Sequence, residues 1–136
     1  MSEKTKDIRL KLQKAKVIME EVDVLVANKL YNTTINRLYY ACFHATKALL
    51  LTKDLTPKTH NGVGTHLQKE FVQKGLFDKQ HAILFVKLMD VRLQNDYGDF
   101  LVVDEDDIEQ FYEPAKAYVQ YITKMVEDYL KTEEQE

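Results

Sequence analysis

The sequence predicts an all-α fold, a single-domain up-and-down bundle of about five helices. Only four glycines and two prolines occur in 136 residues, so long stretches carry no strong break. Apolar residues recur at intervals of three and four, which is the period of an amphipathic helix. With 45% apolar and 30% charged residues, the composition is typical of one globular domain with a hydrophobic core. We therefore expect one domain over residues 1–136, with a frayed polar tail at about 132–136.

The first predicted helix runs from about Asp7 to Asn28 and the second from about Leu30 to Lys53. In the first, apolar residues form one stripe and charged residues fill the other face. In the second, apolar residues surround most of the axis, which indicates a helix buried between others. We expect this central helix to place five residues in the core. They are Leu38, Ala41, Cys42, Ala45 and Leu49.

A loop and a shorter helix follow the central helix. Pro57 and Gly62 interrupt the helical pattern, so residues 52–62 are predicted to form a loop. The third helix holds Val63, Leu67 and other apolar residues, and Gly75 is placed to end it as a C-terminal cap.

The last two predicted helices begin at aspartates. Asp78 can cap a fourth helix that ends near Asp96. Asp104 can cap a fifth, with Asp107 three positions later in the pattern of a capping box. Pro114 lies inside the fifth helix and should bend it.

Charge and cysteine content exclude several classes of protein. The formal net charge of −3 argues against a DNA-binding protein that relies on bulk positive charge, but allows a local basic site. Cys42 is the only cysteine, so neither an internal disulfide nor a cysteine-based zinc site is expected. The acidic run from Asp104 to Asp107 is explained by the start of a helix, and the four histidines lack close zinc spacing. We therefore predict no metal and no cofactor.

The N-terminal residues are too charged for a signal peptide, and no apolar run reaches the length of a membrane span. The sequence accordingly predicts a cytoplasmic protein without a membrane anchor.

Arg37 and His44 are the first candidate site residues, within the stretch "NRLYYACFH". Seven positions separate them, so they lie within about 20° on one helix face, with Tyr40 between them. An arginine can hold a phosphate and a histidine can transfer a proton near neutral pH, so this pair could cleave a phosphodiester without a metal. The alternative is that the tyrosines and His44 are hydrogen-bonded core residues, and that Arg37 pairs with an acidic neighbour. Spacing alone favours this alternative.

Two further segments carry candidate ligand-binding residues. Lys58 and His60 stand before a helix start, which attracts anions, although Thr59 could simply cap that helix. Arg92 and Asp96 are four residues apart and can pair along a helix, and a turn begins at Tyr97. The arginine could stand at the mouth of a groove, or the pair could be an ordinary surface ion pair.

Three segments in this order, "NRLYYACFHATKALLL", "PKTHNGV" and "RLQNDYGDF", resemble the HEPN superfamily. Within it, the chain is similar to small prokaryotic proteins with a tyrosine-rich second helix and a lysine-threonine-histidine loop. The resemblance implies a helical bundle and a homodimer. It also implies a minimal nucleotidyltransferase as a partner, in a toxin–antitoxin module.

The resemblance further implies metal-independent ribonuclease activity, whose family signature is an arginine, four to six residues, and a histidine. Arg37 and His44 satisfy this spacing on the second helix, whereas Arg92 is followed by Asp96 and Tyr97 instead of a histidine. We expect Arg37, His44, the Lys58–His60 loop and Arg92 to converge on one groove that binds a nucleotide or RNA phosphate. A non-catalytic helical module that binds a nucleotide or a partner protein is the alternative.

Overall fold

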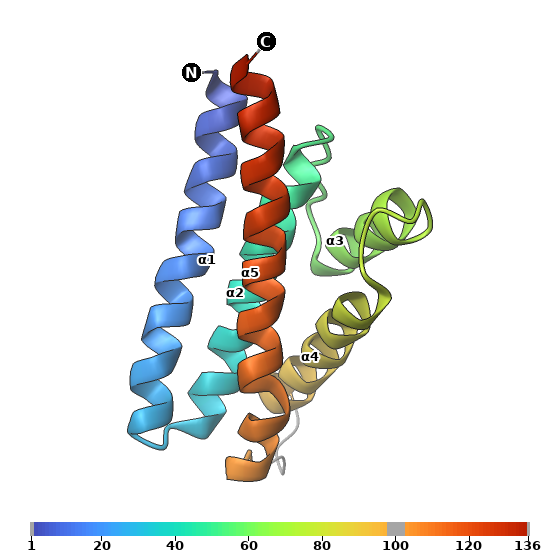
Figure 1. Ribbon diagram of the computed structural model, residues 1–136. Coiled ribbons are helices and arrows are strands. Elements are labelled where there is room, and N and C mark those ends of the chain that lie inside the picture. Colours follow the sequence, from blue (N-terminus) through green and yellow to red (C-terminus); the bar gives the residue numbers. More distant parts are fainter. Residues whose placement is uncertain (1, 98–102, 136) are drawn as a thin grey trace.

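A computed structural model describes residues 2–97 and 103–135, and in this part of the chain all regular structure is helical, as predicted (Figure 1). The N- and C-terminal ends lie at the same end of the bundle, where the first and last helices run side by side. The helices are α1 (Glu3–Ala27), α2 (Tyr31–Leu51), α3 (His60–Leu67), α4 (Lys79–Tyr97) and α5 (Glu105–Gln135). A π-helical turn, η1 (Gln68–Val72), continues α3.

Short polar side chains fix where three of the helices begin. The Ser2 hydroxyl accepts a hydrogen bond from the Thr5 backbone N–H at 3.1 Å, so α1 begins earlier than the predicted start near Asp7. Thr59 caps α3 in the same way, through the Gly62 N–H at 2.9 Å. Asp78 accepts from the His81 N–H at 2.9 Å at the start of α4. The predicted caps at Thr59 and Asp78 are confirmed.

The start of α5 explains the acidic run at residues 104–107. The Asp104 N–H donates to the Asp107 carboxylate at 2.9 Å, and the Asp107 N–H donates to the Asp104 carboxylate at 3.1 Å. This reciprocal pair is the predicted capping box, in which each carboxylate accepts a hydrogen bond from a backbone N–H at the start of the helix. The helix continues through Pro114, and the bend there stays a prediction.

Gly75 ends the segment formed by α3 and η1. Its φ of 73° lies in the left-handed region, which glycine enters without steric cost, and its N–H donates to the Val72 carbonyl. The following N–H, of Leu76, donates to the Phe71 carbonyl at 2.8 Å. The predicted C-terminal cap at Gly75 is therefore confirmed.

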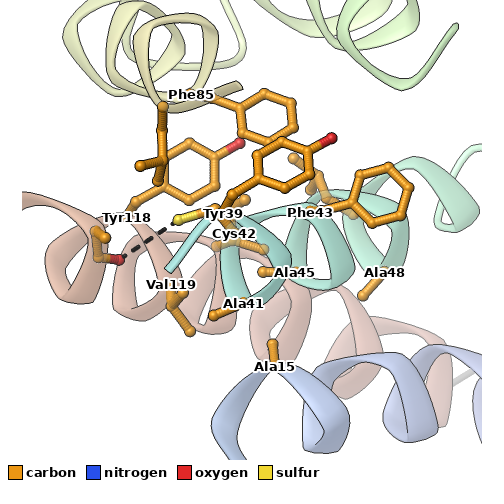
Figure 2. Close-up of a cluster of buried hydrophobic side chains, with 14 of the residues drawn as sticks. Ala15, Tyr39, Ala41, Cys42, Phe43, Ala45, Ala48, Phe85, Tyr118 and Val119 are labelled. Carbon is orange, nitrogen blue, oxygen red and sulfur yellow. Dashed lines mark hydrogen bonds between the residues drawn. The ribbon is translucent and has the colours of Figure 1, made fainter. Parts of the chain in front are cut away.

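The second helix is the centre of the bundle, because α2 packs against α1, α3, α4 and α5. All five of its predicted core residues are buried. Small side chains face α1, and Figure 2 shows Ala15 directed toward the α2 face that carries Ala41 and Ala45. On the opposite side, the Phe85 ring of α4 stacks between Tyr39 and Tyr118, at 5.9 and 5.7 Å between ring centres.

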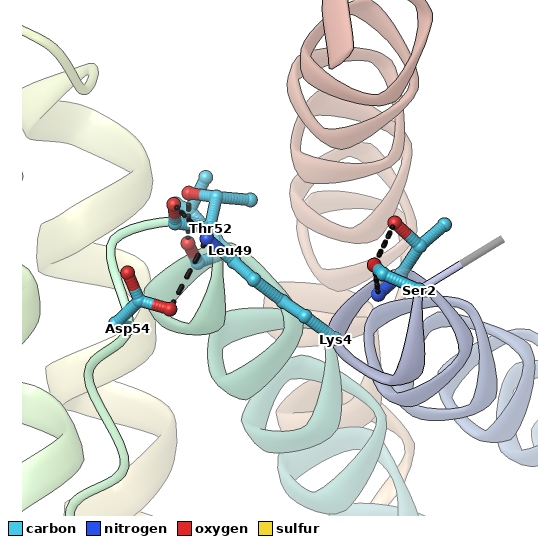
Figure 3. Close-up of polar contacts among 6 residues, drawn as sticks. Ser2, Lys4, Leu49, Thr52 and Asp54 are labelled. Carbon is cyan, nitrogen blue, oxygen red and sulfur yellow. Dashed lines mark hydrogen bonds and ion pairs between the residues drawn. The ribbon is translucent and has the colours of Figure 1, made fainter. Parts of the chain in front are cut away.

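Polar contacts join the start of α1 to the end of α2 (Figure 3). The Lys4 ammonium donates to the Thr52 carbonyl at 3.2 Å and lies 3.1 Å from the Asp54 carboxylate. Both charges are partly solvated, so the ion pair contributes at most about 1 kcal/mol. These contacts position the chain as it leaves α2 toward the loop that precedes α3.

None of the described helices combines the length and the hydropathy that a membrane span requires.

Candidate functional site

Tyr40 is the point at which predicted site residues from three helices meet. Its ring centre lies 6.1 Å from that of His44 on α2 and 5.8 Å from that of His60 at the start of α3. The guanidinium carbon of Arg92 on α4 lies 5.7 Å from the same ring centre. Residues far apart in the sequence are therefore gathered around one half-buried tyrosine.

Tyr39, the neighbour of Tyr40, connects Arg92 to His60. The Arg92 guanidinium lies 4.8 Å from the centre of the buried Tyr39 ring, and the Tyr39 hydroxyl shares a 2.6 Å hydrogen bond with Nδ1 of His60. Burial raises the pKa of Tyr39, while the charge of Arg92 and its hydrogen bond to the hydroxyl oppose that rise. The roles in the bond between Tyr39 and His60 depend on the tautomer of His60, and where Nδ1 is unprotonated the hydroxyl donates to it. His60 then carries its proton on Nε2.

His60 is held as a neutral imidazole. It stacks on Phe43 at 4.4 Å between ring centres, next to the Thr59 cap that sets the start of α3. Its pKa is lowered from 6.5, first because it is partly buried and then because the charges of Arg92 and Lys47 disfavour a further positive charge. A neutral histidine with a protonated Nε2 can donate a hydrogen bond, and the same ring can donate a proton once it is protonated as an imidazolium.

His44 is half-buried, and its pKa is lowered further, to about 4. Burial is the main cause, and the positive charges of Lys14, Lys47, Arg37 and Lys11 add to it. His44 is therefore neutral at pH 7 and available as a proton acceptor. Because cations depress this pKa, an anion bound among them would raise it.

Lys11 and Lys14 of α1 and Lys47 of α2 form a basic flank beside His44. Among the described side chains, no carboxylate lies within ion-pair distance of these three lysines. Burial lowers the pKa of Lys47, and the charges of Lys11 and Lys14 lower it further, as expected where like charges accumulate. The Lys47 ammonium also lies 5.4 Å from the centre of the Phe43 ring. In a chain with a net charge of −3, this local excess of positive charge favours an anionic ligand.

The structure gathers Tyr40, His44, His60 and Arg92, and we name these four residues the Tyr40 cluster. Arg37 lies 3.8 Å from the Glu21 carboxylate, which is the pairing that the alternative interpretation predicted, although its charge still acts on His44.

Lys58 does not belong to this cluster. It is exposed, and no contact joins it to the cluster within residues 2–97 and 103–135. The side chains of Asp96 and Tyr97 lie outside the described part, as does the predicted Arg92–Asp96 pair.

Three contributors were not predicted as site residues: Tyr39, Phe43 and Lys47. The sequence signal for the first two is their spacing of four, which places both on the helix face next to Tyr40. Lys47 follows His44 by three positions, so it too lies beside the histidine. Across the described residues, no group of three or more histidine, cysteine, aspartate or glutamate side chains could hold a metal ion. Cys42 is fully buried, with its thiol 3.9 Å from the Ala115 carbonyl oxygen, and burial raises its pKa (Figure 2).

Comparison with known proteins identifies the family, because the model of the HEPN domain matches residues 8–128. The chain belongs to the HEPN family. The family predicted from the three sequence segments is thereby confirmed.

Relatives of this HEPN-domain chain include proteins of Methanocaldococcus jannaschii and Thermotoga maritima. It is 36% identical over 129 residues to "Putative toxin MJ0605" of Methanocaldococcus jannaschii, covering 92% of this chain and 96% of that protein. It is 30% identical over 128 residues to a "UPF0332 protein" of Thermotoga maritima, covering 94% and 97%. A second M. jannaschii relative, "Putative toxin MJ0142", is 30% identical over 98 residues, covering 72% and 67%.

Proposed function

We propose that this HEPN-domain protein is the toxin component of a toxin–antitoxin module and that it cleaves RNA at the Tyr40 cluster. Two relatives are named as toxins, which supports the biological role. The observation that carries the chemical proposal is that two neutral histidines and a buried arginine border the ring of Tyr40. The basic flank beside His44 supports a ligand that carries phosphates.

In the proposed reaction, a ribose 2′-hydroxyl attacks the adjacent phosphorus while the bond from phosphorus to the 5′-oxygen breaks. His44, neutral at pH 7, accepts the proton of the 2′-hydroxyl. A bound phosphate offsets the charges of Arg92 and Lys47 and so favours protonated His60, which donates its Nε2 proton to the departing 5′-oxygen and becomes neutral. Arg92 and Lys47 stabilise the negative charge that develops on the phosphate oxygens. The products are a 2′,3′-cyclic phosphate and a 5′-hydroxyl, with one proton gained by His44 and one lost by His60.

An RNA-cleavage assay on the wild type and on His44→Ala and His60→Ala variants tests the proposal. General acid–base catalysis contributes roughly 10²–10⁴-fold, so each substitution should lower the rate by about 100-fold or more. His81→Ala is the matched control, because His81 also stacks on an aromatic ring, at 4.5 Å from Tyr121, and lies outside the Tyr40 cluster.

Thermal unfolding of the same four proteins separates lost chemistry from lost structure. The proposal requires that His44→Ala and His60→Ala remain folded at the assay temperature while their cleavage rates fall. Wild-type rates in both variants would contradict it, as would an equal loss in His81→Ala.

A second candidate function is binding of RNA or a nucleotide without cleavage. The low pKa of His44, about 4, favours it, because so weak a base accepts a proton from a hydroxyl inefficiently. Under this function, labelled RNA binds the wild type and stays intact, and Arg92→Ala weakens the binding. Accumulation of cleaved products in the same mixture would exclude it.

The family resemblance also supports a minimal nucleotidyltransferase as the partner and the cytoplasm as the location. Co-expression of the two chains followed by size-exclusion chromatography tests the partner. A complex that elutes as one species is the expected result, and two separate species would contradict it.

A further inference from the structure

Lys47 of α2 and Lys116 of α5 are partly buried lysines with opposite surroundings. The Lys47 ammonium lies 5.4 Å from the centre of the Phe43 ring. The Lys116 ammonium lies 4.3 Å from the centre of the Tyr112 ring and 2.9 Å from the Asp23 carboxylate. Lys47 has no carboxylate within ion-pair distance in the described part of the chain. Both lysines therefore contact an aromatic ring, but only Lys116 also has an anionic partner.

The charged neighbours of Lys47 are the other two lysines of the basic flank. Lys11 and Lys14 lie within about one turn of Ala15, the α1 residue that Figure 2 shows directed toward α2. The positive charges of Lys11, Lys14 and Lys47 all act on His44, which precedes Lys47 by one helical turn. The packing of α1 on α2 thus gathers three ammonium groups without a carboxylate between them.

These surroundings favour the uncharged amine of Lys47. Partial burial lowers its pKa from 10.5, and the charges of Lys11 and Lys14 lower it further. Hydrogen bonds to Asp23 and Tyr112 raise the pKa of Lys116. Only an uncharged amine has the lone pair that attacks an electrophile, so Lys47 is the more nucleophilic lysine of the two.

The basic flank also favours a reagent that carries phosphate. Lys14 is exposed and Lys11 partly exposed, and neither is paired with a described carboxylate, so both can hold a phosphate group. An acyl phosphate joins such a group to an electrophilic carbonyl carbon. With its phosphate on Lys11 and Lys14, this reagent would bring its carbonyl carbon to the amine of Lys47.

We propose that Lys47 is an acylation site whose reagent is a small acyl phosphate held by Lys11 and Lys14. The amine nitrogen forms a bond to the carbonyl carbon, and the bond from that carbon to the phosphate oxygen breaks. The electron pair of this bond and a proton from the nitrogen go to the departing phosphate. The products are an uncharged amide at Lys47 and hydrogen phosphate.

Acylation would regulate the site proposed above, because the amide removes one cation from the basic flank beside His44. This regulatory role rests on the proposed function, whereas the acylation itself does not. The experiments below therefore measure acylation in the absence of RNA, and their results do not depend on whether the protein cleaves RNA.

Incubation of the full chain with acetyl phosphate, followed by peptide mass spectrometry, compares the lysines in one sample. Lys47 should be acetylated about tenfold faster than Lys116, since the uncharged fraction of an amine changes tenfold with each unit of pKa. It should also react faster than Lys29, which is exposed. A rate at Lys47 no higher than that at Lys116, or lower than that at Lys29, would overturn the proposal.

A double variant, Lys11→Gln with Lys14→Gln, tests the role of the two lysines of α1. It should lower the rate of acetylation at Lys47 several-fold. Lys16→Gln is the matched control, because Lys16 is also an exposed lysine of α1 but lies outside the basic flank. It should leave the rate unchanged, and thermal unfolding verifies that both proteins are folded. An unchanged rate in the double variant would contradict the proposal.

Competition with inorganic phosphate tests the nature of the reagent. Excess phosphate should slow the reaction of Lys47 with acetyl phosphate, because both anions bind Lys11 and Lys14. It should not slow the reaction with N-acetoxysuccinimide, an acetyl donor without charge. Equal slowing with both donors, or with neither, would overturn the assignment of an acyl phosphate as the reagent.

Discussion

Two histidines in this bundle stack on aromatic rings at almost the same distance, and their surroundings differ. His60 lies 4.4 Å from Phe43, and His81 lies 4.5 Å from Tyr121. His60 is hydrogen-bonded to Tyr39, beneath the guanidinium of Arg92. Among the described residues, no cation lies over the rings of His81 and Tyr121. This stack lies at the start of α4.

The polar groups around His81 serve the helix start. The Asp78 N–H donates to the Tyr121 hydroxyl at 3.0 Å, and the Asp78 carboxylate accepts from the His81 backbone N–H. At the start of α3, Thr59 provides the corresponding cap. The imidazole of His60 takes no part in that cap and is hydrogen-bonded to Tyr39. Ring stacking alone therefore does not distinguish a functional histidine from a structural one. The buried guanidinium of Arg92 and the Tyr39 hydroxyl beside His60 make this distinction.

Phe85 supports both stacks, because its ring lies between Tyr39 and Tyr118, and Tyr118 lies 6.0 Å from His81. Phe85→Ala should lower the free energy of unfolding by about 3–5 kcal/mol, as large-to-small changes in a core do. Phe85→Leu, which keeps most of the volume, should cost much less. Urea denaturation of both variants measures the difference, and a loss below about 1 kcal/mol in Phe85→Ala would show that the two stacks do not share this support.

The two tyrosine hydroxyls offer a matched pair of substitutions. Tyr39→Phe removes the hydrogen bond to His60, and Tyr121→Phe removes the one from Asp78. Each should cost about 1 kcal/mol of stability, the net value of one hydrogen bond. Only Tyr39→Phe should also slow RNA cleavage, by about tenfold, because His60 loses the contact that fixes its tautomer. Equal effects on cleavage would remove the distinction between the two histidines.

The pH dependence of stability tests the environment of His44. The pKa of His44 is about 4 in the folded chain and near 6.5 when unfolded, so between these values the unfolded chain binds more protons. The free energy of unfolding should therefore be fully retained above about pH 6.5 and fall as the pH drops toward about 4. His60, whose pKa is also lowered, should act in the same direction.

Urea denaturation at about pH 7.5 and about pH 5 measures this loss. His44→Gln should lose less stability than the wild type over that interval. His81→Gln controls for the substitution itself, and an equally reduced loss in that variant would show that His44 is not the cause.

The fold was predictable because each of its determinants is local. The period of the apolar residues, the caps at Thr59, Asp78 and Asp104, and Gly75 all act within a few positions of the chain. The buried face of α2 followed from the same pattern.

The candidate site was predictable only in part, because its contacts join distant segments. Arg37 and His44 share a helix face, yet Arg37 also pairs with Glu21 of α1, which helix periodicity does not specify. The contact of Tyr39 with His60 depends on how α3 docks, and that of Arg92 with Tyr39 on how α4 packs. For the same reason, Lys11 and Lys14 lower the pKa of His44 only because α1 packs beside α2 in the folded chain.

The imidazole NMR signals of the four histidines test most directly whether the Tyr40 cluster is the site. An RNA oligonucleotide with 2′-O-methyl groups cannot be cleaved by attack of its 2′-oxygen, so it reports binding without turnover. On its addition, the ring signals of His44 and His60 should shift, and the pKa of His44 should rise from about 4 as phosphates offset the neighbouring cations. The signals of His66 and His81 should stay in place. Shifts confined to His66 or His81, or no shift at any histidine under saturating RNA, would contradict the account.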